Sequence, residues 1–427
     1  MQNVKIIPST VHGTLKIPPS KSQTMRALIF ALMAKGKSTI YNSLQSPDVE
    51  AMAQAIEKLG AQVHRTHDGY SIEGTGGNFR KEDLEIDCRN SGQVLRFLGS
   101  LATLSHQQIC FTGDPSIQKI RPVQPLIGAL NQLGAKATSD GAFPLIVQGP
   151  KTKTRATLSG EDSQPISGLL LLGAFSPIQL RVINPGEIPW VQLTLSWLDR
   201  FQIPYRNDRF TMFETQGGAK LNGFEYRVAS DLSSMAFPLA LTLLSPSSLI
   251  LDEIELEDGQ GDQEILSILE SMNAVFQYES KQLSVPKQRT LQGTTIDING
   301  CIDALPILAV IGCFARGKTE IVNGAIARKK ESDRIHTITM ELQKMGAHIE
   351  EKEDGLVIYE SKLKGNHHLN AHQDHRIAMA LTIAGLCAEG NSTLLGVECV
   401  AKSYPTFFTD LRDLGANLVL YPDGGIF

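Results

Sequence analysis

The sequence predicts an α/β protein of two domains that is built from a sixfold internal repeat. A polar helix start, an apolar helix, a turn and a strand recur along the 427 residues. Each copy continues into an amphipathic helix that ends in a Leu-Gly-Ala-like turn. The centres of these turns lie about 70 residues apart, at Gly60, Gly134, Gln202, Asn273, Gly346 and Gly415. Because the chain is too long for one ordinary core, we expect three copies in each domain.

The first copy shows the pattern most clearly. Ser20 or Ser22 can cap a helix, and Gly36 is expected to end it before a β-branched strand. Lys21 and Arg26 lie in the first turn of this helix, where free backbone N–H groups already favour anions. Helix starts usually prefer acidic residues, so two cations there suggest a phosphate or carboxylate ligand. A capped surface helix with solvated cations is the alternative.

Similar helix starts recur in the other copies, which are Asn90-Ser91-Gly92, Asp162-Ser163-Gln164, Asp231-Leu232-Ser233, Asp303-Ala304 and Asp374-His375-Arg376. If equivalent helices point the same end inward, their N-termini converge. The helix dipoles and nearby cations would then form a cleft that attracts a small, multiply anionic ligand. The cations concerned are Lys21, Arg26, Arg121, Lys330, Arg334, Arg376 and Lys402.

No linker of low complexity marks a domain boundary, so the repeat count must supply it. The third copy ends near Ala229, just before the Asp231 cap. The opening strands, around His12-Gly13, precede the first cap and could complete the sixth copy instead of the first. We therefore expect one domain over residues 19–229 and a discontinuous second domain over residues 1–18 plus 230–427, with a hinge at the two crossings.

The composition argues against a nucleic-acid-binding protein, a membrane-spanning protein and a secreted protein. A net charge of −5 argues against a general nucleic-acid surface, and no apolar run reaches membrane-spanning length. The start of the chain is strand-like and does not resemble a signal peptide. The six Cys show no Cys-x-x-Cys spacing, as expected of reduced thiols in a cytoplasmic protein.

Two apparent ligand motifs are rejected. Gly312-x-x-x-x-Gly317-Lys318-Thr319 matches the phosphate-loop pattern, but a helix precedes it and a strand follows, the reverse of what that loop requires. His367, His368, His372 and His375 lack the spacing of metal ligands, so we expect no metal.

Two charged motifs are stronger candidates for chemistry. In Lys330-Glu331-Ser332-Asp333-Arg334, Ser332 or Asp333 can cap a helix, and Glu331 lies between cations, as a proton donor or acceptor would. Asp374-His375-Arg376 combines a cap, an imidazole and a guanidinium in one turn, and arginine suits carboxylate or phosphate binding. The alternatives are a solvated helix start for the first motif and, for Asp303, an ordinary N-cap.

These motifs, in order along the whole chain, resemble those of 5-enolpyruvylshikimate-3-phosphate (EPSP) synthases. The matching segments are Pro19-Ser20-Lys21-Ser22-x-x-x-Arg26, Asn90-Ser91-Gly92, Arg121-Pro122, Ser163-Gln164, Lys330-Glu331-Ser332-Asp333-Arg334, Asp374-His375-Arg376-Ile377-Ala378-Met379 and Lys402-Ser403-Tyr404-Pro405. The resemblance implies an inside-out α/β barrel of six βαβαββ repeats, with parallel helices whose N-termini face an interdomain cleft. It implies transfer of the enolpyruvyl group of phosphoenolpyruvate to the 5-hydroxyl of shikimate 3-phosphate, in aromatic amino-acid synthesis. It also implies a monomer without metal or organic cofactor, and a target of glyphosate.

The resemblance assigns roles by position. Shikimate 3-phosphate would be held by Lys21, Ser22, Arg26, Ser163, Gln164, Asp303 and Lys330. Phosphoenolpyruvate would be held by Lys21, Gly92, Arg121, Gln164, Arg334, His375, Arg376 and Lys402. Glu331 would protonate C3, Asp303 would act as base near the hydroxyl, and Lys21 would help to stabilise charge.

The chain departs from the family pattern near the sugar phosphate. Glu187-Ile188-Pro189-Trp190 replaces Ser-Arg-Pro-Tyr, Asp162 replaces a serine, and Ile326 replaces an asparagine. Gln93 and Phe97 replace a threonine and a proline after Gly92, where close approach of the backbone to the ligand is expected.

Two other functions compete. A UDP-N-acetylglucosamine enolpyruvyl transferase would carry a loop cysteine near Arg121, but residues 116–123 contain none, and Cys110 lies in a strand-like run. A catalytically silent binding protein of the same fold is opposed by the intact Lys21, Asp303, Glu331 and Arg376.

Overall fold

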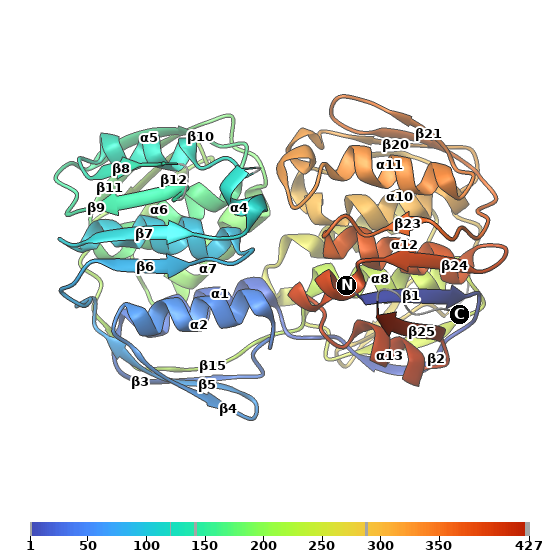
Figure 1. Ribbon diagram of the computed structural model, residues 1–427, viewed down its shortest axis with the longest axis horizontal. Coiled ribbons are helices and arrows are strands. Elements are labelled where there is room, and N and C mark those ends of the chain that lie inside the picture. Colours follow the sequence, from blue (N-terminus) through green and yellow to red (C-terminus); the bar gives the residue numbers. More distant parts are fainter. Residues whose placement is uncertain (1, 120, 141–142, 287–288, 423–427) are drawn as a thin grey trace. The chain divides into compact units, whose positions relative to one another are not determined.

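The computed structural model describes residues 2–119, 121–140, 143–286 and 289–422. The chain forms two compact units (Figure 1), each described by itself. The N-terminal unit is Pro19–Ala229, and the C-terminal unit is Ser230–Phe427 together with Met1–Pro18. Each unit has its own hydrophobic core. Among the described residues, no helix is long and apolar enough to cross a membrane.

One sheet pattern recurs in both units. The described residues form six sheets, of which five have four strands and one has five. In each sheet an edge strand, which we call the lead-in strand, runs parallel to its neighbour. Two further antiparallel strands complete the sheet, as in β6-β7-β9-β8. The bounds in that sheet are β6 Leu84–Asp87, β7 Gln108–Thr112, β9 Leu145–Gln148 and β8 Lys136–Thr138.

The N-terminal unit holds two further sheets. The five-stranded sheet contains β3 (Ala34–Tyr41), β5 (Gly69–Thr75), β4 (Gln62–Thr66), β14 (Leu221–Asn222) and β15 (Glu225–Arg227). Here the lead-in strands β14 and β15 come from the end of the unit and pair in parallel with β3, which lies near its start. The other sheet contains β10 (Arg155–Ser159), β11 (Ile178–Ile183), β13 (Met212–Thr215) and β12 (Tyr205–Asp208).

The C-terminal unit holds three sheets. The first contains β2 (His12–Lys16), β16 (Ser248–Asp252), β18 (Gln282–Ser284) and β17 (Gln277–Glu279). The second contains β19 (Thr295–Asp297), β20 (Lys318–Val322), β22 (Leu356–Tyr359) and β21 (His348–Glu351). The third contains β23 (Leu369–Asn370), β24 (Ser392–Leu395), β1 (Gln2–Ile7) and β25 (Asn417–Pro422).

The two opening strands serve different repeats. Strand β1 pairs with β24 and β25 and so completes the sixth repeat, as the sequence suggested. Strand β2 instead pairs in parallel with β16 and is the lead-in strand of the fourth repeat. The start of the chain therefore contributes to two of the three sheets of the C-terminal unit.

The helices are of two kinds, apolar and amphipathic, according to the pattern of apolar and polar residues in each. The helix that begins each repeat is apolar almost all round and is buried, as such helices must be. These inner helices are α1 (Lys21–Met33), α6 (Ser163–Phe175), α8 (Leu232–Leu244), α10 (Leu305–Phe314) and α12 (His375–Cys387). Helices α8, α10 and α12 pack against one another, as Figure 1 shows.

The second helix of each repeat is amphipathic and buries its apolar face in the core of its unit. These helices are α2 (Pro47–Lys58), α5 (Gln124–Gln132), α7 (Ile188–Arg200), α9 (Glu264–Ser271), α11 (Arg334–Lys344) and α13 (Phe407–Asp413). Helix α4 (Pro115–Lys119) and the one-turn to two-turn helices η3 (Leu256–Asp258), η4 (Gly261–Gln263), η5 (Asn299–Ala304), η6 (Ala325–Lys329) and η7 (Val397–Lys402) complete the set.

The inner helix of the second repeat is irregular. It contains a π-helical segment, η1 (Val94–Leu98), which runs into α3 (Gly99–Leu101) and a 3₁₀ turn, η2 (Ala102–Leu104). π-Helical segments are rare and often lie at functional sites. This segment follows Gly92 directly.

One local prediction is wrong and another is confirmed. Gly36 does not end the first helix: α1 ends at Met33, and Gly36 lies inside β3, because pairing with β5 begins one residue earlier, at Lys35. The phosphate-loop match is correctly rejected, because α10 precedes Gly317 and β20 follows it.

Candidate active site

In the C-terminal unit, Asp374 organises the start of α12. Its carboxylate is fully buried and caps the helix by accepting a hydrogen bond from the backbone N–H of Arg376, at 3.0 Å. It also accepts from Arg334 Nε at 2.8 Å and from the Ser332 hydroxyl at 3.1 Å. The cap expected from the sequence is thus also the counter-ion of an arginine that begins another helix.

Arg334 is the first residue of α11, which Asp333 caps through the backbone N–H of His336. Its guanidinium is only 1% exposed. It donates from Nη1 to Asp303 at 2.6 Å and from Nη2 to Glu331 at 2.8 Å. Burial by itself would lower the pKa of Arg334, but Asp374, Glu331 and Asp303 raise it above its ordinary value. The side chain is therefore a fixed positive charge shared by three carboxylates.

Asp303 is not the ordinary N-cap that was one possibility. Ala304 occupies the cap position of α10, which has no side-chain cap, and Asp303 lies in η5. Its second oxygen accepts from Arg376 Nη2 at 2.9 Å. Burial alone would raise the pKa of Asp303, but Arg376 and Arg334 hold it well below its usual range, with help from Lys330. The carboxylate is ionised at neutral pH.

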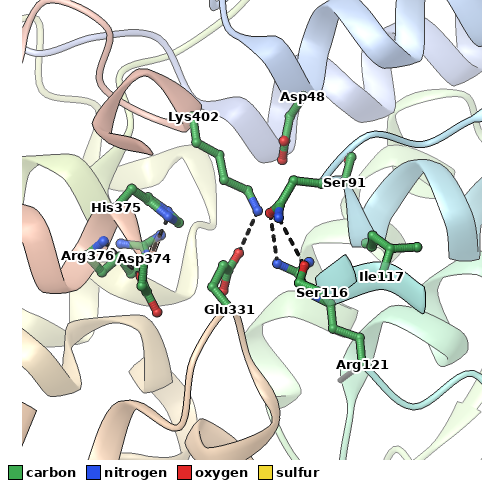
Figure 2. Close-up of polar contacts among 12 residues, drawn as sticks. Asp48, Ser91, Ser116, Ile117, Arg121, Glu331, Asp374, His375, Arg376 and Lys402 are labelled. Atoms are coloured by element: carbon green, nitrogen blue, oxygen red, sulfur yellow. Dashed lines mark hydrogen bonds and ion pairs between the residues drawn. The ribbon is translucent and has the colours of Figure 1, made fainter. Parts of the chain in front are cut away.

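Glu331 lies between two cations. The motif predicted Lys330 and Arg334; Arg334 is one of the two cations, and the other is Lys402. Figure 2 shows the ammonium of Lys402 directed at its carboxylate, at 2.8 Å from Oε1, while Arg334 holds Oε2. Both side chains are nearly buried, at 10% and 9% exposed. His375 is buried beside Asp374 at the start of α12. We call Asp303, Glu331, Arg334, Asp374, Arg376 and Lys402 the acid–base cluster.

In the N-terminal unit, Ser20 is the residue that caps α1. Lys21 follows, and its ammonium lies 3.4 Å from the carboxylate of Asp48. Asp48 belongs to the first turn of α2 and is itself nearly buried. Asp48 does not stand out in the sequence, because an acidic residue at a helix start is too common to suggest a function.

Arg26 is a buried structural cation, 2% exposed. It donates to the Thr194 hydroxyl at 2.8 Å, the Trp190 carbonyl at 3.2 Å and the Ser22 carbonyl at 3.1 Å. The ring of Phe97 lies 5.2 Å from its guanidinium carbon. Burial lowers the pKa of Arg26 to about 9, against a smaller opposing effect of Tyr226, so it stays charged at neutral pH.

The second repeat supplies Gly92 and Arg121. A Cβ at Gly92 would lie 2.8 Å from Arg96 Nη1, 2.8 Å from Gln164 Oε1 and 2.9 Å from Arg121 Nη1, so no side chain fits without displacing them. Arg121 donates to Asn90 Oδ1 at 3.2 Å. Asn90 in turn donates to Asp114 and to Ser116, and Figure 2 shows Arg121 and Ser116 near each other.

Helix α6 begins with two carboxylates close to its free N–H groups. Asp162 caps Gln164 N at 3.0 Å and lies 3.4 Å from Arg96 Nε. Glu187 accepts hydrogen bonds from the backbone N–H and the hydroxyl of Ser163. In the sequence both residues stand out only as departures from the family pattern. Arg96 does not stand out at all, because its apolar neighbours give no sign that a cation is buried there.

The structure therefore groups the predicted residues within each unit. The acid–base cluster brings together Asp303, Glu331, Arg334, Arg376 and Lys402. In the N-terminal unit, Gly92, Arg121 and Gln164 form one group, and Ser22 and Arg26 another. Lys21 pairs separately with Asp48. Ile326, by contrast, packs in the hydrophobic core. Over the described ranges, no three His, Cys, Asp or Glu side chains are placed to hold a metal ion.

Comparisons with known proteins agree along the whole chain. The profile of the EPSP synthase (3-phosphoshikimate 1-carboxyvinyltransferase) family matches residues 6–411. The chain is 40% identical over 428 residues to the 3-phosphoshikimate 1-carboxyvinyltransferase of Chlamydia caviae, covering 99% of this chain and 95% of that one. It is 40% identical over 420 residues to that of Acetivibrio thermocellus, covering 97% and 99%.

Solved structures give the same picture. The structure is similar to an EPSP synthase from Acinetobacter baumannii, with a TM-score of 0.82 and 25% identity, covering 99% of this chain and all of that one. It shares its fold with the enolpyruvyl transferase NikO from Streptomyces tendae, with a TM-score of 0.80 at 15% identity over 98% and 99% of the two chains.

Proposed function

Since the chain belongs to the EPSP synthase family and is a 3-phosphoshikimate 1-carboxyvinyltransferase, we propose that the acid–base cluster and the helix starts of the N-terminal unit act on the same two substrates. The enzyme transfers the enolpyruvyl group of phosphoenolpyruvate to shikimate 3-phosphate in aromatic amino-acid biosynthesis. We also propose the finer arrangement that the family resemblance implies: an inside-out barrel in each unit, parallel helices with their N-termini toward the substrates, and action as a monomer.

Phosphoenolpyruvate is held by arginines and a lysine that already carry carboxylate partners. Arg376, Arg334 and Lys402 now neutralise Asp303, Asp374 and Glu331. A ligand with a carboxylate and a phosphate competes for these cations, with bidentate arginine contacts as the strongest. His375, Gly92, Arg121, Gln164 and Lys21 complete the phosphoenolpyruvate site. The internal pairs keep the cations oriented and desolvated before the ligand arrives.

Shikimate 3-phosphate is held mainly by helix starts of the N-terminal unit. Ser22, Ser163 and Gln164 lie in the first turns of α1 and α6, where backbone N–H groups favour a phosphate. Lys21 and Lys330 add charge. Arg26 ties the first turn of α1 to α7, because it donates hydrogen bonds to the Trp190 carbonyl and to the Thr194 hydroxyl. It therefore orients the start of α1 and also contributes positive charge to the shikimate 3-phosphate site.

Two carboxylates move the protons. Glu331 takes up a proton from solvent once phosphoenolpyruvate draws Lys402 and Arg334 away from its carboxylate. It then donates this proton to C3 of phosphoenolpyruvate, which makes C2 electrophilic. The 5-hydroxyl oxygen attacks C2 and gives its proton to Asp303. The tetrahedral intermediate then expels phosphate with the electrons of the bond between C2 and the phosphate oxygen. C3 returns a proton to Glu331, and Asp303 passes its proton to the departing phosphate. Asp303 is a weak base while Arg376 and Arg334 hold it, and it gains basicity when phosphoenolpyruvate takes up part of their charge.

One observation carries the assignment of Glu331 and Asp303 as the two proton-transferring groups. Glu331 lies between Lys402 and Arg334, and the same Arg334 also binds Asp303. The test is phosphate release by the purified protein with phosphoenolpyruvate and shikimate 3-phosphate, compared with phosphoenolpyruvate and UDP-N-acetylglucosamine. We expect turnover with the first pair alone. Normal turnover by both Glu331→Gln and Asp303→Asn would remove these residues from the mechanism.

A further inference from the structure

The N-terminal unit has an open cavity between the start of α2 and the sheet beside it. The cavity measures about 400 Å³, within the range of roughly 300–1,000 Å³ that is usual for sites of small molecules. Helix α2 packs against β4 of that sheet (Figure 1). The cavity is lined by Glu50 of α2, Arg65 of β4, Tyr70 of β5 and Arg89 of the loop after β6, together with neighbouring residues. None of these four residues belongs to the proposed substrate sites.

One of the two arginines is already neutralised by the single acid. Arg65 donates from Nε to Glu50 Oε2 at 3.0 Å and from Nη2 to Glu50 Oε1 at 2.6 Å. Two parallel hydrogen bonds of this kind are a strong pairing of arginine with a carboxylate. They hold the pKa of Glu50 below its ordinary value, so this carboxylate is ionised at neutral pH. The negative charge of Glu50 is therefore engaged by Arg65.

The other arginine, Arg89, forms no ion pair with any carboxylate among the described residues, and Glu50 acts on it only at longer range. Its Nη2 donates to the neutral amide oxygen of Gln54 at 3.0 Å. Its backbone is fixed, because its N–H donates to Asp87 Oδ1 at 2.7 Å and its carbonyl accepts from the N–H of Asp114 at 2.8 Å. A guanidinium has five N–H donors, so Arg89 can bind an oxyanion and still keep Gln54.

Tyr70 supplies a second donor. Its side chain is 4% exposed, and its hydroxyl forms no hydrogen bond within the described part of the chain. Glu50 and Arg65 both influence its ionisation, so the hydroxyl lies near the side chains that line the cavity. Burial, with a smaller effect of Glu50, raises the pKa of Tyr70 to about 12, so the hydroxyl keeps its proton at neutral pH. A nearly buried phenol usually has a hydrogen-bond partner, and one that faces a cavity without a partner therefore indicates a ligand.

We propose that this cavity is a second binding site, for a small oxyanion that is a carboxylate or a phosphate, with Arg89 and Tyr70 as its principal donors. The oxyanion accepts hydrogen bonds from the Arg89 guanidinium and from the Tyr70 hydroxyl. Two positive side chains and one negative side chain line the cavity, so an anion improves the balance of charge there. An ammonium group gains less, because Arg65 already occupies the Glu50 carboxylate. The site is additional to the transferase reaction and does not depend on where the substrates bind.

The test uses the full-length enzyme labelled with 3-fluorotyrosine, so that the ¹⁹F resonance of Tyr70 reports on the cavity directly. The Tyr70→Phe variant assigns this resonance. Saturating shikimate 3-phosphate and glyphosate are present throughout, so that the catalytic site stays in one state. Inorganic phosphate and benzoate are titrated separately as probes of the two classes of oxyanion, and potassium chloride at equal ionic strength is the control for screening.

Four variants, compared by calorimetric titration under the same conditions, locate the donors. Arg89→Gln removes the guanidinium, and its control is Arg80→Gln, an exposed arginine of the same unit that does not line the cavity. Tyr70→Phe removes the hydroxyl, and its control is Tyr41→Phe, an exposed tyrosine of β3 that does not line the cavity either. Thermal unfolding checks that each variant is folded.

We expect the Tyr70 resonance to shift and to saturate at millimolar concentrations of phosphate, of benzoate or of both, and the probe with the lower Kd identifies the class of ligand. Arg89→Gln should raise the Kd of that probe about tenfold or more, because it removes a charged hydrogen-bond donor. Tyr70→Phe should raise it about threefold or more, because it removes a neutral donor. The two control variants should each change the Kd less than about twofold, because surface substitutions away from a site have small effects.

Three results would overturn the inference, and they have different meanings. If neither probe shifts the Tyr70 resonance beyond the effect of potassium chloride, the cavity binds no oxyanion. If Arg80→Gln weakens binding as much as Arg89→Gln does, the anion responds to the general charge of the unit and not to a site. If Arg89→Gln and Tyr70→Phe both bind the probe as the wild type does, the anion binds elsewhere. None of these results bears on the transferase reaction, which is measured separately by phosphate release.

Discussion

At the scale of single residues, the acid–base cluster is held together by one buried arginine. Arg334 contacts Asp303, Glu331 and Asp374 at once, so each carboxylate has a fixed orientation before any ligand binds. Preorganised charge of this kind needs little rearrangement during reaction.

Glu331→Gln should lower kcat by about 10²–10⁴-fold while changing substrate binding far less, because an amide cannot donate and recover the proton at C3. Steady-state kinetics and equilibrium titration with phosphoenolpyruvate separate the two effects. Glu350→Gln, which removes an exposed carboxylate paired with Lys352, is the control and should be fully active. A Glu331→Gln enzyme within twofold of wild-type kcat would contradict the role.

Gly92→Ala should raise the KM for phosphoenolpyruvate, because the new methyl group would lie within 3 Å of Arg96, Gln164 and Arg121 atoms. Overpacking of a tight site typically costs about 1–3 kcal/mol, or roughly 5–150-fold in affinity. Gly128→Ala is the control, since a Cβ on this glycine of α5 meets nothing within 4 Å. An unchanged KM for Gly92→Ala would show that the site opens freely.

At the scale of elements, both ends of α11 form hydrogen bonds with the loop that precedes α12. Arg334 at its start binds Asp374, and Glu341 near its end binds His372 Nε2 at 2.7 Å and Lys344 Nζ at 2.8 Å. His372 and Gln373 both have left-handed backbones. Glu341 is fully buried. The loop that precedes α12 and carries Asp374 is therefore held by side chains from both ends of α11.

Glu341→Gln should therefore destabilise the enzyme by about 1–3 kcal/mol at pH 7, the cost of leaving buried donors poorly matched. Burial would raise the pKa of Glu341, but His372 and Lys344 lower it below its ordinary value. A lowered folded pKa gives stability that is present above the unfolded pKa, about 4.5, and is lost as the pH falls through the folded pKa.

Urea unfolding of wild type and Glu341→Gln between pH 7 and pH 3 measures this effect. The difference between the two proteins should shrink toward pH 3. A difference that is constant with pH would show that packing, and not the charge of Glu341, supports the loop.

The π-helical segment behind Gly92 bears on inhibitor discrimination. Gln93 donates to the Ser22 hydroxyl at 3.2 Å, and its own amide oxygen is buried without a hydrogen-bond partner among the described residues. Phe97 is fully buried in the core, with Arg26 against its ring. Both residues thus contact side chains of the proposed substrate site.

The double variant Gln93→Thr/Phe97→Pro should lower the ratio of the glyphosate inhibition constant to the phosphoenolpyruvate KM by about 5–30-fold, equivalent to 1–2 kcal/mol. The reason is that Gln93 and Phe97 are expected to shift the backbone of Gly92 toward the ligand. Because glyphosate is longer than phosphoenolpyruvate, this shift weakens the binding of glyphosate more. Inhibition kinetics on both proteins give the ratio. An unchanged ratio would mean that the buried Phe97 ring does not influence Gly92.

At the scale of the whole molecule, the chain passes between its two units at Pro18–Pro19 and at Ala229–Ser230. Ser20 N donates to Ala229 O at 2.8 Å, and Asp231 N donates to Pro18 O at 2.7 Å. The two crossings are thus paired segments next to the helix starts of α1 and α8. Such a short, paired connection is suited to act as a hinge.

We expect the radius of gyration from small-angle scattering to fall when shikimate 3-phosphate and glyphosate are added together, because residues of both units are proposed to bind the same ligands. Lys21→Met combined with Arg376→Met, which removes one cation from each unit, should abolish the change. An unchanged radius of gyration for the wild type with both ligands would count against ligand-driven closure.

The sequence by itself determined the family, the reaction and the sixfold repeat. It also identified most of the helix starts that carry polar residues, because a cap and its helix are set by neighbours a few residues apart. Ser20, Asp162, Asp231 and Asp374 each cap the helix that the pattern predicted. The contact of Glu331 with Arg334 was also predictable, since the two residues are three apart in the sequence, but the second cation is Lys402 and not the expected Lys330.

Only the tertiary structure decided which charges meet. Asp303 is bound by arginines 31 and 73 residues away, and Lys402 reaches Glu331 across 71 residues. The buried Arg96 beside Asp162 and the carboxylate of Glu187 on Ser163 were equally invisible. A repeat pattern reports the local geometry of each helix, but ion pairs between repeats depend on which side chains are buried together, where an unpaired charge would be too costly to keep.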